Sequence, residues 1–289
     1  MRSLMAPLSS LFVVLLLAGP LAHSAELTGT LKTIKERKAM LIGYPVDAYP
    51  MSFRSADGKA QGYSIDLCLQ VAGEVKKAVG LSDLDIRFVP VTLDARFDAV
   101  AGGEVDIECG TSTMTLSRME KVDFTSMTFV DGGSLLVRKG SAIHGVVSLV
   151  DESVAVIPGT TTDRALRDAL AKSYVNAKVV TVKDHKEGFD LLESGKISAY
   201  ATDRVLLVGL LAKSQKNDTL EIAADQFSYE PYGFVVRRGD ADFRLVANRA
   251  LAQLYRSQEI VKIFEKWFGS LGKPSDVLII MYGLNALPN

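Results

Sequence analysis

Histidine, cysteine and tryptophan are scarce in this sequence of 289 residues, which contains 3, 2 and 1 of them. Its two cysteines, Cys68 and Cys109, lie far apart and form no Cys-x-x-Cys pair, so we expect no zinc site and no other metal ion or cofactor. An even cysteine count permits one disulfide in an exported protein, and two buried thiols are the alternative. Both states stay open at this stage.

An excess of charge of one sign is also missing. The chain has 33 Lys and Arg against 34 Asp and Glu, a formal net charge of −1. A nucleic-acid partner would need a basic excess, so we expect none. After residue 25 there is no apolar run of the roughly 20 residues that a membrane span needs, so we expect the rest of the chain to be soluble.

The first 25 residues have a composition of their own. Arg2 is their only charge, an apolar run from Leu11 to Ala18 follows, and Pro20 ends that run. The small residues of 22–25 then offer a cleavage site, after Ser24 or after Ala25. This pattern predicts a cleaved secretory signal peptide over residues 1–25. A membrane anchor is the alternative, but the run is shorter than a span.

Apolar runs and helical patterns alternate along the first half of the remaining chain. We expect strands over residues 39–44, 86–91 and 105–109, with helices from about residue 64 and from a cap at Asp94 between them. This order implies a parallel α/β sheet with right-handed crossovers.

The same alternation restarts after residue 130. We expect strands over residues 133–138, 153–157, 177–182, 197–202 and 234–237, and helices from about residues 159, 184, 203, 241 and 258. Two α/β units in one chain, with no Pro- or Ser-rich linker between them, suggest two lobes that face each other.

Particular segments resemble a known family. They are Gly62-Tyr-Ser-Ile-Asp66, Val105-Asp-Ile-Glu-Cys-Gly-Thr-Ser-Thr113 with Arg118, Val122-Asp-Phe-Thr125, Pro158-Gly-Thr-Thr161, Lys183-Asp-His185, Ala199-Tyr-Ala-Thr-Asp203, Tyr232-Gly233 and Glu265-Lys-Trp-Phe-Gly269. In this order they are similar to the bacterial extracellular solute-binding proteins of family 3, which bind amino acids. Within that family, Glu-Cys-Gly and Lys-Asp-His are most similar to the glutamate/aspartate-binding subgroup.

The resemblance implies an α/β fold of the type II-like periplasmic binding proteins, with two lobes, a ligand cleft between them and two hinge crossovers. The crossovers are expected near residues 129–132 and 228–232. The first lobe would then comprise residues 26–129 and 232–289, including the C-terminal helices and tail, and the second lobe residues 130–231.

A site for a free amino acid must recognise a carboxylate and an ammonium. Arg118 occupies the family's position for the carboxylate clamp, and a planar guanidinium suits that task better than an ammonium does. Thr111 and Thr113 precede it and offer hydroxyls at a strand end, where open α/β sheets bind ligands. The alternative interpretation is a solvated surface arginine.

Two residues of the second half complete this part of the site. Thr161 lies at a predicted helix start, where free N–H groups attract anions, and the resemblance assigns it to the carboxylate. Asp203 follows a predicted strand and occupies the family's position for the ammonium contact. Its alternative role is to cap the next helix.

Arg96 and His185 match the positions that bind the distal carboxylate in the acidic subgroup, and each has a surface role as its alternative. Near a carboxylate, the pKa of His185 should be raised, so that acidic ligands would bind less well above about pH 7–8. Pro45 stands where the acidic subgroup carries an arginine. Glutamate or aspartate is therefore favoured, and a polar or larger dicarboxylic ligand stays open.

The expected function is that of the periplasmic substrate-binding subunit of an ABC-type amino-acid importer, which is not an enzyme. Its partners would be a free acidic or polar amino acid and an inner-membrane ABC permease with its ATPase, and the protein would be a monomer. A ligand sensor for a membrane receptor is one alternative. A periplasmic dehydratase on a similar fold is another, with Glu230 and His185 as its candidate acid–base residues.

Overall fold

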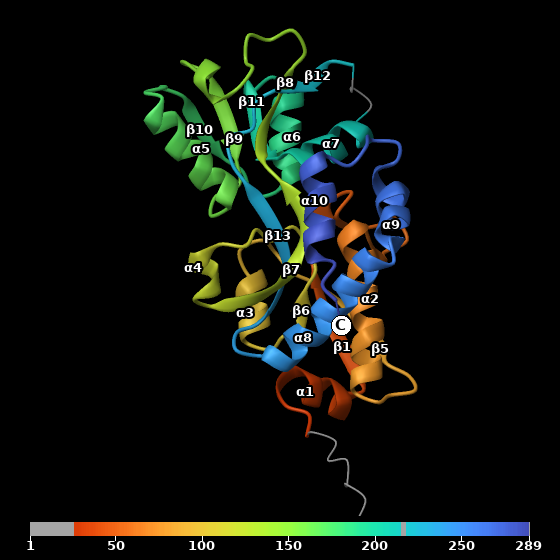
Figure 1. The fold of residues 1–289 in the computed structure, drawn as a ribbon. Coiled ribbons are helices and arrows are strands. Elements are labelled where there is room, and N and C mark those ends of the chain that lie inside the picture. Colours follow the sequence, from red (N-terminus) through yellow and green to blue (C-terminus); the bar gives the residue numbers. More distant parts are fainter. Residues whose placement is uncertain (1–25, 215–217, 289) are drawn as a thin grey trace, which may run out of the picture.

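Two lobes, each built around a five-stranded sheet, make up the molecule (Figure 1). The structure is a computed structural model that describes residues 26–214 and 218–288. The predicted signal peptide, residues 1–25, lies outside the described residues. No helix in the described part of the chain is long and apolar enough to cross a membrane.

The sheet of the first lobe has the strand order β5-β1-β6-β13-β7. Its strands are β1 (Ala39–Tyr44), β5 (Asp85–Pro90), β6 (Ile107–Glu108), β7 (Val122–Asp131) and β13 (Glu230–Arg237). Strand β1 runs parallel to β5 and β6, whereas β13 runs antiparallel to β6 and β7. A small three-stranded sheet of β2 (Asp47–Ala48), β3 (Ser52–Arg54) and β4 (Ala60–Gln61) follows β1 in the chain.

The sheet of the second lobe has the order β10-β9-β11-β8-β12. Its strands are β8 (Gly133–Arg138), β9 (Ser153–Val156), β10 (Lys178–Thr181), β11 (Ala199–Asp203) and β12 (Leu220–Ile222). Strand β9 is parallel to β10 and β11, but β8 is antiparallel to β11 and β12. The predicted all-parallel sheets are therefore wrong. The chain passes between the lobes from β7 to β8 and from β12 to β13. Parallel neighbours in one sheet require a long crossover connection, but strands that enter a sheet from the other lobe can be antiparallel without one.

Helices cover both sheets. They are α1 (Gly29–Arg37), α2 (Tyr63–Ala78), α3 (Arg96–Ala101), α4 (Leu116–Met119), α5 (Thr161–Lys172), α6 (His185–Glu193), α7 (Arg204–Lys213), α8 (Ala241–Arg256), α9 (Glu259–Phe268) and α10 (Asp276–Asn285), with a short 3-10 helix at Val146–Ser148. Side chains cap several of them: Thr160 accepts the N–H of Asp163, and Asp184 accepts that of Glu187. The predicted cap at Asp94 is wrong by one residue, because Ala95 occupies the cap position of α3.

The two crossovers between the lobes lie side by side. Gly132 alone separates β7 from β8, and residues 223–229 lead from β12 back to β13, whose first residue Glu230 pairs with Asp131. A Cβ atom at Gly132 would lie 2.6 Å from the carbonyl oxygen of Ser228, so this close approach requires glycine. Figure 1 shows β7 and β13 running together from one lobe towards the other.

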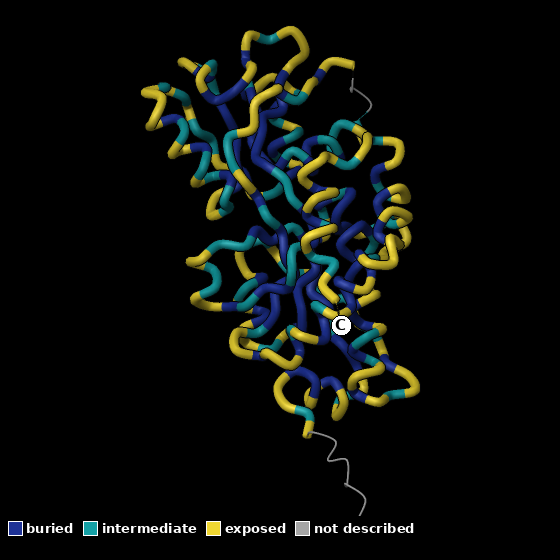
Figure 2. Tube along the Cα trace, in the orientation of Figure 1, coloured by how far each residue is buried: buried dark blue, intermediate teal, exposed yellow. Residues whose placement is uncertain are grey.

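An aromatic cluster anchors these strands in the first lobe. Phe129 of β7 stacks on Tyr232 of β13 at 6.0 Å and on Phe268 of α9 at 5.6 Å, and Tyr63 of α2 meets Phe129 edge-on. All four side chains belong to the largest buried cluster of the molecule, which Figure 2 shows as the dark interior of that lobe. The strands that leave for the second lobe are therefore fixed at their base by packing.

A disulfide joins Cys68 of α2 to Cys109, the residue directly after β6, with the Cα atoms 6.2 Å apart. This separation lies within the usual range for disulfides. Of the two states that the sequence left open, the structure has the disulfide. The bond ties the helix α2 to the start of the segment that contains Thr111 and Thr113.

Reduction of this disulfide should destabilise the protein. The two cysteines are 41 residues apart, and closing a loop of that length lowers the entropy of the unfolded chain by about 4 kcal/mol at 25 °C in the chain-entropy account. Urea unfolding with and without dithiothreitol measures the difference. The double variant Cys68→Ser/Cys109→Ser should resemble the reduced protein and ignore the reductant. An unchanged unfolding midpoint of the reduced wild type would contradict the expectation.

Candidate functional site

A small cavity of about 30 Å³ lies between the lobes, and all seven residues predicted for the site line it. The first lobe supplies Arg96 at the start of α3, Thr111 and Thr113 after β6, and Arg118 in α4. The second lobe supplies Thr161 at the start of α5, His185 at the start of α6 and Asp203 at the end of β11. The remaining lining residues are Leu93, Thr160, Thr162, Thr202 and Leu206.

Arg118 is held from two directions. Its backbone N–H is capped by the Thr115 hydroxyl at 3.2 Å, and its guanidinium donates to the carbonyl oxygen of Thr113 at 2.8 Å. The guanidinium carbon lies 4.9 Å from the centre of the Phe97 ring. Burial lowers the pKa of Arg118 to about 10, so the side chain stays charged at neutral pH. The guanidinium thus belongs to the cavity wall, not to an open surface.

Arg96 is buried and shares the same aromatic ring, with its guanidinium carbon 4.4 Å from the centre of Phe97. It donates to the carbonyl oxygen of Leu93 and, through Nε, to the Ser112 hydroxyl at 2.9 Å. Ser112 donates in turn to Glu108 at 2.8 Å. Burial lowers the pKa of Arg96, and the Glu108 carboxyl opposes that shift. The solvated alternative for Arg96 does not fit this environment.

Asp203 occupies the cap position of α7, yet its side chain makes no capping bond. One carboxylate oxygen accepts from the Thr162 hydroxyl at 2.6 Å, and the other accepts from the Tyr232 hydroxyl at 2.5 Å. Burial, followed by repulsion from Glu230, raises the pKa of Asp203 to about 6. The carboxylate is therefore held at the junction of the lobes by one donor from each lobe.

His185 is buried, and its Nδ1 lies 2.8 Å from the Tyr200 hydroxyl. Burial lowers the pKa of His185 below its ordinary value near 6.5. Asp47 and Asp184 oppose this effect only in part. The predicted upward shift concerns the complex with a ligand carboxylate, and it stays a prediction. The neutral ring prevails at pH 7.

Glu230 contacts two threonines of the cavity wall but does not itself line the cavity. The sequence singled it out only as an acid–base candidate for the alternative, enzymatic function. Its carboxylate accepts three hydroxyl hydrogen bonds, from Thr113 at 2.5 Å, Thr161 at 2.7 Å and Ser228 at 2.6 Å. Glu230 is the first residue of β13. It lies within the crossover expected near residues 228–232, and this position could have indicated a hinge residue.

The position at which the acidic subgroup carries an arginine contributes nothing to the cavity wall. Pro45 is not among the lining residues, and its ring instead packs so near Gly110 that a Cβ there would lie 2.8 Å from it. Leu93 and Leu206 supply the apolar part of the wall. The polar part of the wall includes Arg96 and His185.

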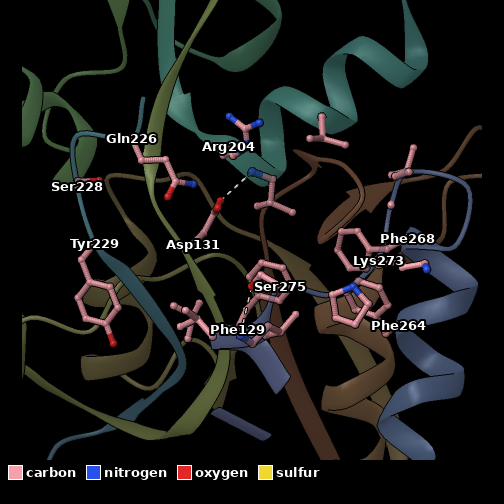
Figure 3. Close-up of a pocket in the computed structure, with 18 residues that line it drawn as sticks. Phe129, Asp131, Arg204, Gln226, Ser228, Tyr229, Phe264, Phe268, Lys273 and Ser275 are labelled. Carbon is pink, nitrogen blue, oxygen red and sulfur yellow. Dashed lines mark hydrogen bonds between the residues drawn. The ribbon is translucent and has the colours of Figure 1, made fainter. Parts of the chain in front are cut away.

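Asp131 is the last residue of β7 and pairs with Glu230 at the hinge. No pattern in the sequence indicated a role for it. Its carboxylate accepts the backbone N–H of Val205 at 2.8 Å, at the start of α7, as the dashed line in Figure 3 shows. It borders a pocket of about 420 Å³ that is also lined by Arg204, Ser228 and Phe268. Burial, followed by repulsion from Asp203, raises the pKa of Asp131 to about 8.

The residues that the structure describes contain no group of three or more His, Cys, Asp or Glu that could hold a metal ion. The chemistry of the cavity is that of a polar recognition site. Cationic donors come from the first lobe, and a carboxylate and a histidine come from the second.

Comparison with known proteins gives consistent matches. Residues 40–270 match the bacterial extracellular solute-binding proteins, family 3. The L-glutamate/L-aspartate-binding protein of Pseudomonas aeruginosa is 39% identical over 269 residues, 93% of this chain and 89% of that protein. The glutamate/aspartate import solute-binding protein of Escherichia coli is 33% identical over 239 residues, 83% of this chain and 79% of that protein.

Solved structures show the same similarity. A mutant of the arginine-binding protein of T. maritima matches with a TM-score of 0.73 at 28% identity, over 83% of this chain and 100% of that one. An ancestral amino-acid-binding protein, AncCDT-1, described as a precursor of cyclohexadienyl dehydratase, matches with a TM-score of 0.72 at 32% identity and the same coverage. The two-lobed fold expected from the sequence is confirmed.

Substitution of Asp131 by asparagine should change how stability depends on pH. The pKa of Asp131 is raised in the folded protein, so the stability that its protonated form contributes is complete below about pH 4 and is lost as the pH rises to about 8. Asp131→Asn keeps a neutral group there. It should exceed the wild type by about 1–2 kcal/mol at pH 8, a discounted value because Asp131 is partly exposed, and lose most of this advantage at pH 5.

Chemical unfolding at the two pH values measures this difference. Asp168→Asn, which changes an exposed carboxyl of α5, serves as the control and should show the same stability relative to wild type at both. An Asp131→Asn effect of equal size at pH 5 and pH 8 would refute a raised pKa.

Proposed function

Because the chain belongs to the bacterial extracellular solute-binding proteins, family 3, we propose that it is the periplasmic substrate-binding subunit of an ABC-type amino-acid importer. It captures a free amino acid between its lobes and delivers it to an inner-membrane permease with its ATPase. The predicted signal peptide, residues 1–25, would direct it to the periplasm.

The placement of Arg118 and Asp203 carries this proposal. They come from opposite lobes and line the same cavity, so a single ligand that carries both a carboxylate and an ammonium satisfies both lobes at once. Arg118 keeps N–H groups beyond the one that bonds Thr113, and Asp203 is already buried at the junction. Such a ligand gains its full set of charge-assisted hydrogen bonds only when the lobes close.

The size of the cavity supports lobe closure as part of the cycle. A volume of about 30 Å³ has room for about two water-sized spheres, and a free amino acid is several times larger than a water molecule. The lobes must therefore separate before a ligand enters. We propose that residues 26–129 and 232–289 move as one lobe and residues 130–231 as the other, about the two adjacent crossovers.

Glutamate or aspartate is the ligand that we propose. The two relatives described above are named as glutamate- and aspartate-binding proteins. In the cavity of this chain, Arg96 and His185 offer a cation and a ring N–H for a second carboxylate. A bound carboxylate would also favour the protonated form of His185. With Pro45 in place of a further donor, Arg96 carries most of this recognition.

Catalysis is the less favoured function. The precursor of a dehydratase among the similar structures makes an enzyme worth considering. However, the Glu230 carboxylate is occupied by three hydroxyl donors outside the cavity lining, and Nδ1 of His185 is occupied by Tyr200. Glu230 is therefore not placed to transfer a proton to a ligand, and His185 keeps only the ring nitrogen that we assign to the distal carboxylate. We propose binding without turnover, and we also propose that the protein is a monomer without a nucleic-acid partner.

A thermal-shift experiment with each of the twenty amino acids tests the proposed function. A ligand that binds the folded protein alone raises its melting temperature, by an amount that grows with concentration above Kd. We expect the largest shifts from glutamate and aspartate. No shift with any amino acid would overturn the proposal, and turnover of prephenate to an aromatic product would favour the enzyme.

Arg118→Ala should abolish measurable binding while the protein stays folded. Truncating one partner of a desolvated charge pair costs about 2–5 kcal/mol, which is a loss of roughly 30-fold to several thousand-fold in affinity. Titration calorimetry with glutamate, beside a melting curve, measures both properties. Arg87→Ala, which removes an exposed arginine paired with Asp85, is the matched control and should bind normally. Binding by Arg118→Ala within about threefold of wild type would remove Arg118 from the site.

The preference for glutamate over glutamine should depend on pH through His185. The pKa of His185 is lowered in the ligand-free protein and should rise when a carboxylate binds beside the ring. The preference for glutamate is therefore greatest at low pH and falls as the pH rises through the pKa of His185 in the complex. We expect a decrease of about threefold to tenfold between pH 6 and pH 8, and a flat profile for His185→Ala. Tighter binding of glutamine than glutamate at pH 6 would exclude an acidic ligand.

A further inference from the structure

Glu230 is in contact with both lobes of the proposed binding site. It is the first residue of β13, the residue is 1% exposed, and it pairs in the sheet with Asp131 of the other hinge strand. One oxygen, Oε2, accepts from the Thr113 hydroxyl of the first lobe at 2.5 Å and from the Thr161 hydroxyl of the second lobe at 2.7 Å. The other oxygen accepts from Ser228 at 2.6 Å.

These contacts fix the orientation of two hydroxyls that line the cavity. A threonine hydroxyl has one hydrogen and two lone pairs. When the hydrogens of Thr113 and Thr161 point to Glu230, their oxygens present lone pairs to the cavity, which suit an ammonium donor. The two hydroxyl oxygens are 3.3 Å apart, so one carboxylate oxygen holds them as a pair.

The arrangement depends on the relative position of the lobes. Thr113 follows β6 of the first lobe, whereas Thr161 begins α5 of the second, so both reach Oε2 together only when the lobes are closed. A buried carboxylate needs several donors to offset the loss of its hydration, and opening the lobes would remove one of the two threonine donors.

We propose that Glu230 is a positioning residue that favours the closed form of the protein and sets Thr113 and Thr161 as acceptors for the ligand's ammonium. This role replaces the carboxylate contact that the family resemblance gives Thr161, because a hydroxyl that donates its one hydrogen to Glu230 cannot donate to a carboxylate. This inference rests on the proposed function, since it assigns the regulation of the same site. Glu230 acts through the two threonines and does not itself touch the ligand.

The lobe position without ligand gives the first test. Glu230→Gln replaces one acceptor oxygen by an amide and removes the charge, so the ligand-free protein should be more open. Small-angle scattering should then show a larger radius of gyration than that of wild type. Glu104→Gln, which changes an exposed glutamate of the first lobe, is the matched control and should leave the radius unchanged. This readout needs no ligand and holds even if the proposed function fails.

Ligand binding gives the second test. We expect Glu230→Gln to weaken glutamate binding by about 10- to 100-fold. In a Thr161→Val background, where the hydroxyl is absent, the same substitution should weaken binding by less than threefold. A merely structural role of Glu230 would give the same loss in both backgrounds, because effects at unconnected sites add.

Glu230→Asp keeps the charge but shortens the side chain by one methylene, and it serves if the glutamine variant does not fold. It should also open the ligand-free protein, because one oxygen no longer reaches both threonines. A radius of gyration and a Kd equal to those of wild type, for either variant, would overturn the inference. Failure of wild type to bind any amino acid would instead overturn the proposed function, while the ligand-free radius still decides the role of Glu230.

Discussion

The burial of opposite charges at the junction of the lobes is the constraint on which the rest of the structure depends. Arg96 and Arg118 come from one lobe, and Asp203 comes from the other, with Glu230 on the hinge strand β13. Moving such groups out of water is unfavourable unless each finds hydrogen-bond partners. The hydroxyls and backbone groups around them provide those partners in the closed form.

The scaffold around the junction keeps these groups in place. The aromatic cluster of Tyr63, Phe129, Tyr232 and Phe268 packs beneath the hinge strands, and Tyr232 also donates to Asp203 from this cluster. The Cys68–Cys109 disulfide secures the segment that begins at Gly110 and contains the site threonines. A rigid first lobe thus presents its donors in one geometry, and the second lobe completes the site by moving towards it.

Much of this arrangement was predictable from the sequence, because strand and helix patterns are local. The strand at 39–44 and the helix starts near 161, 185 and 204 were expected within a few residues, and all seven proposed ligand-binding residues share one cavity. The antiparallel strands were not expected, since a strand's direction depends on which lobe the chain has just left. Periodicity does not contain that information.

The environment of individual side chains was the least predictable property. A sequence shows that His185 follows a strand and a cap, but its lowered pKa results from burial by residues distant in the chain. Glu230 and Asp131 likewise gain their roles from pairing across two crossovers. Such properties depend on the partners that folding brings together, and no local pattern records them.

The most direct test of the account is a crystal structure of the protein with glutamate bound. We expect one glutamate between the lobes, with its α-carboxylate on Arg118, its ammonium on Asp203 and its distal carboxylate beside Arg96 and His185. A ligand bound elsewhere, or one in this cavity whose ammonium lies away from Asp203, would contradict it.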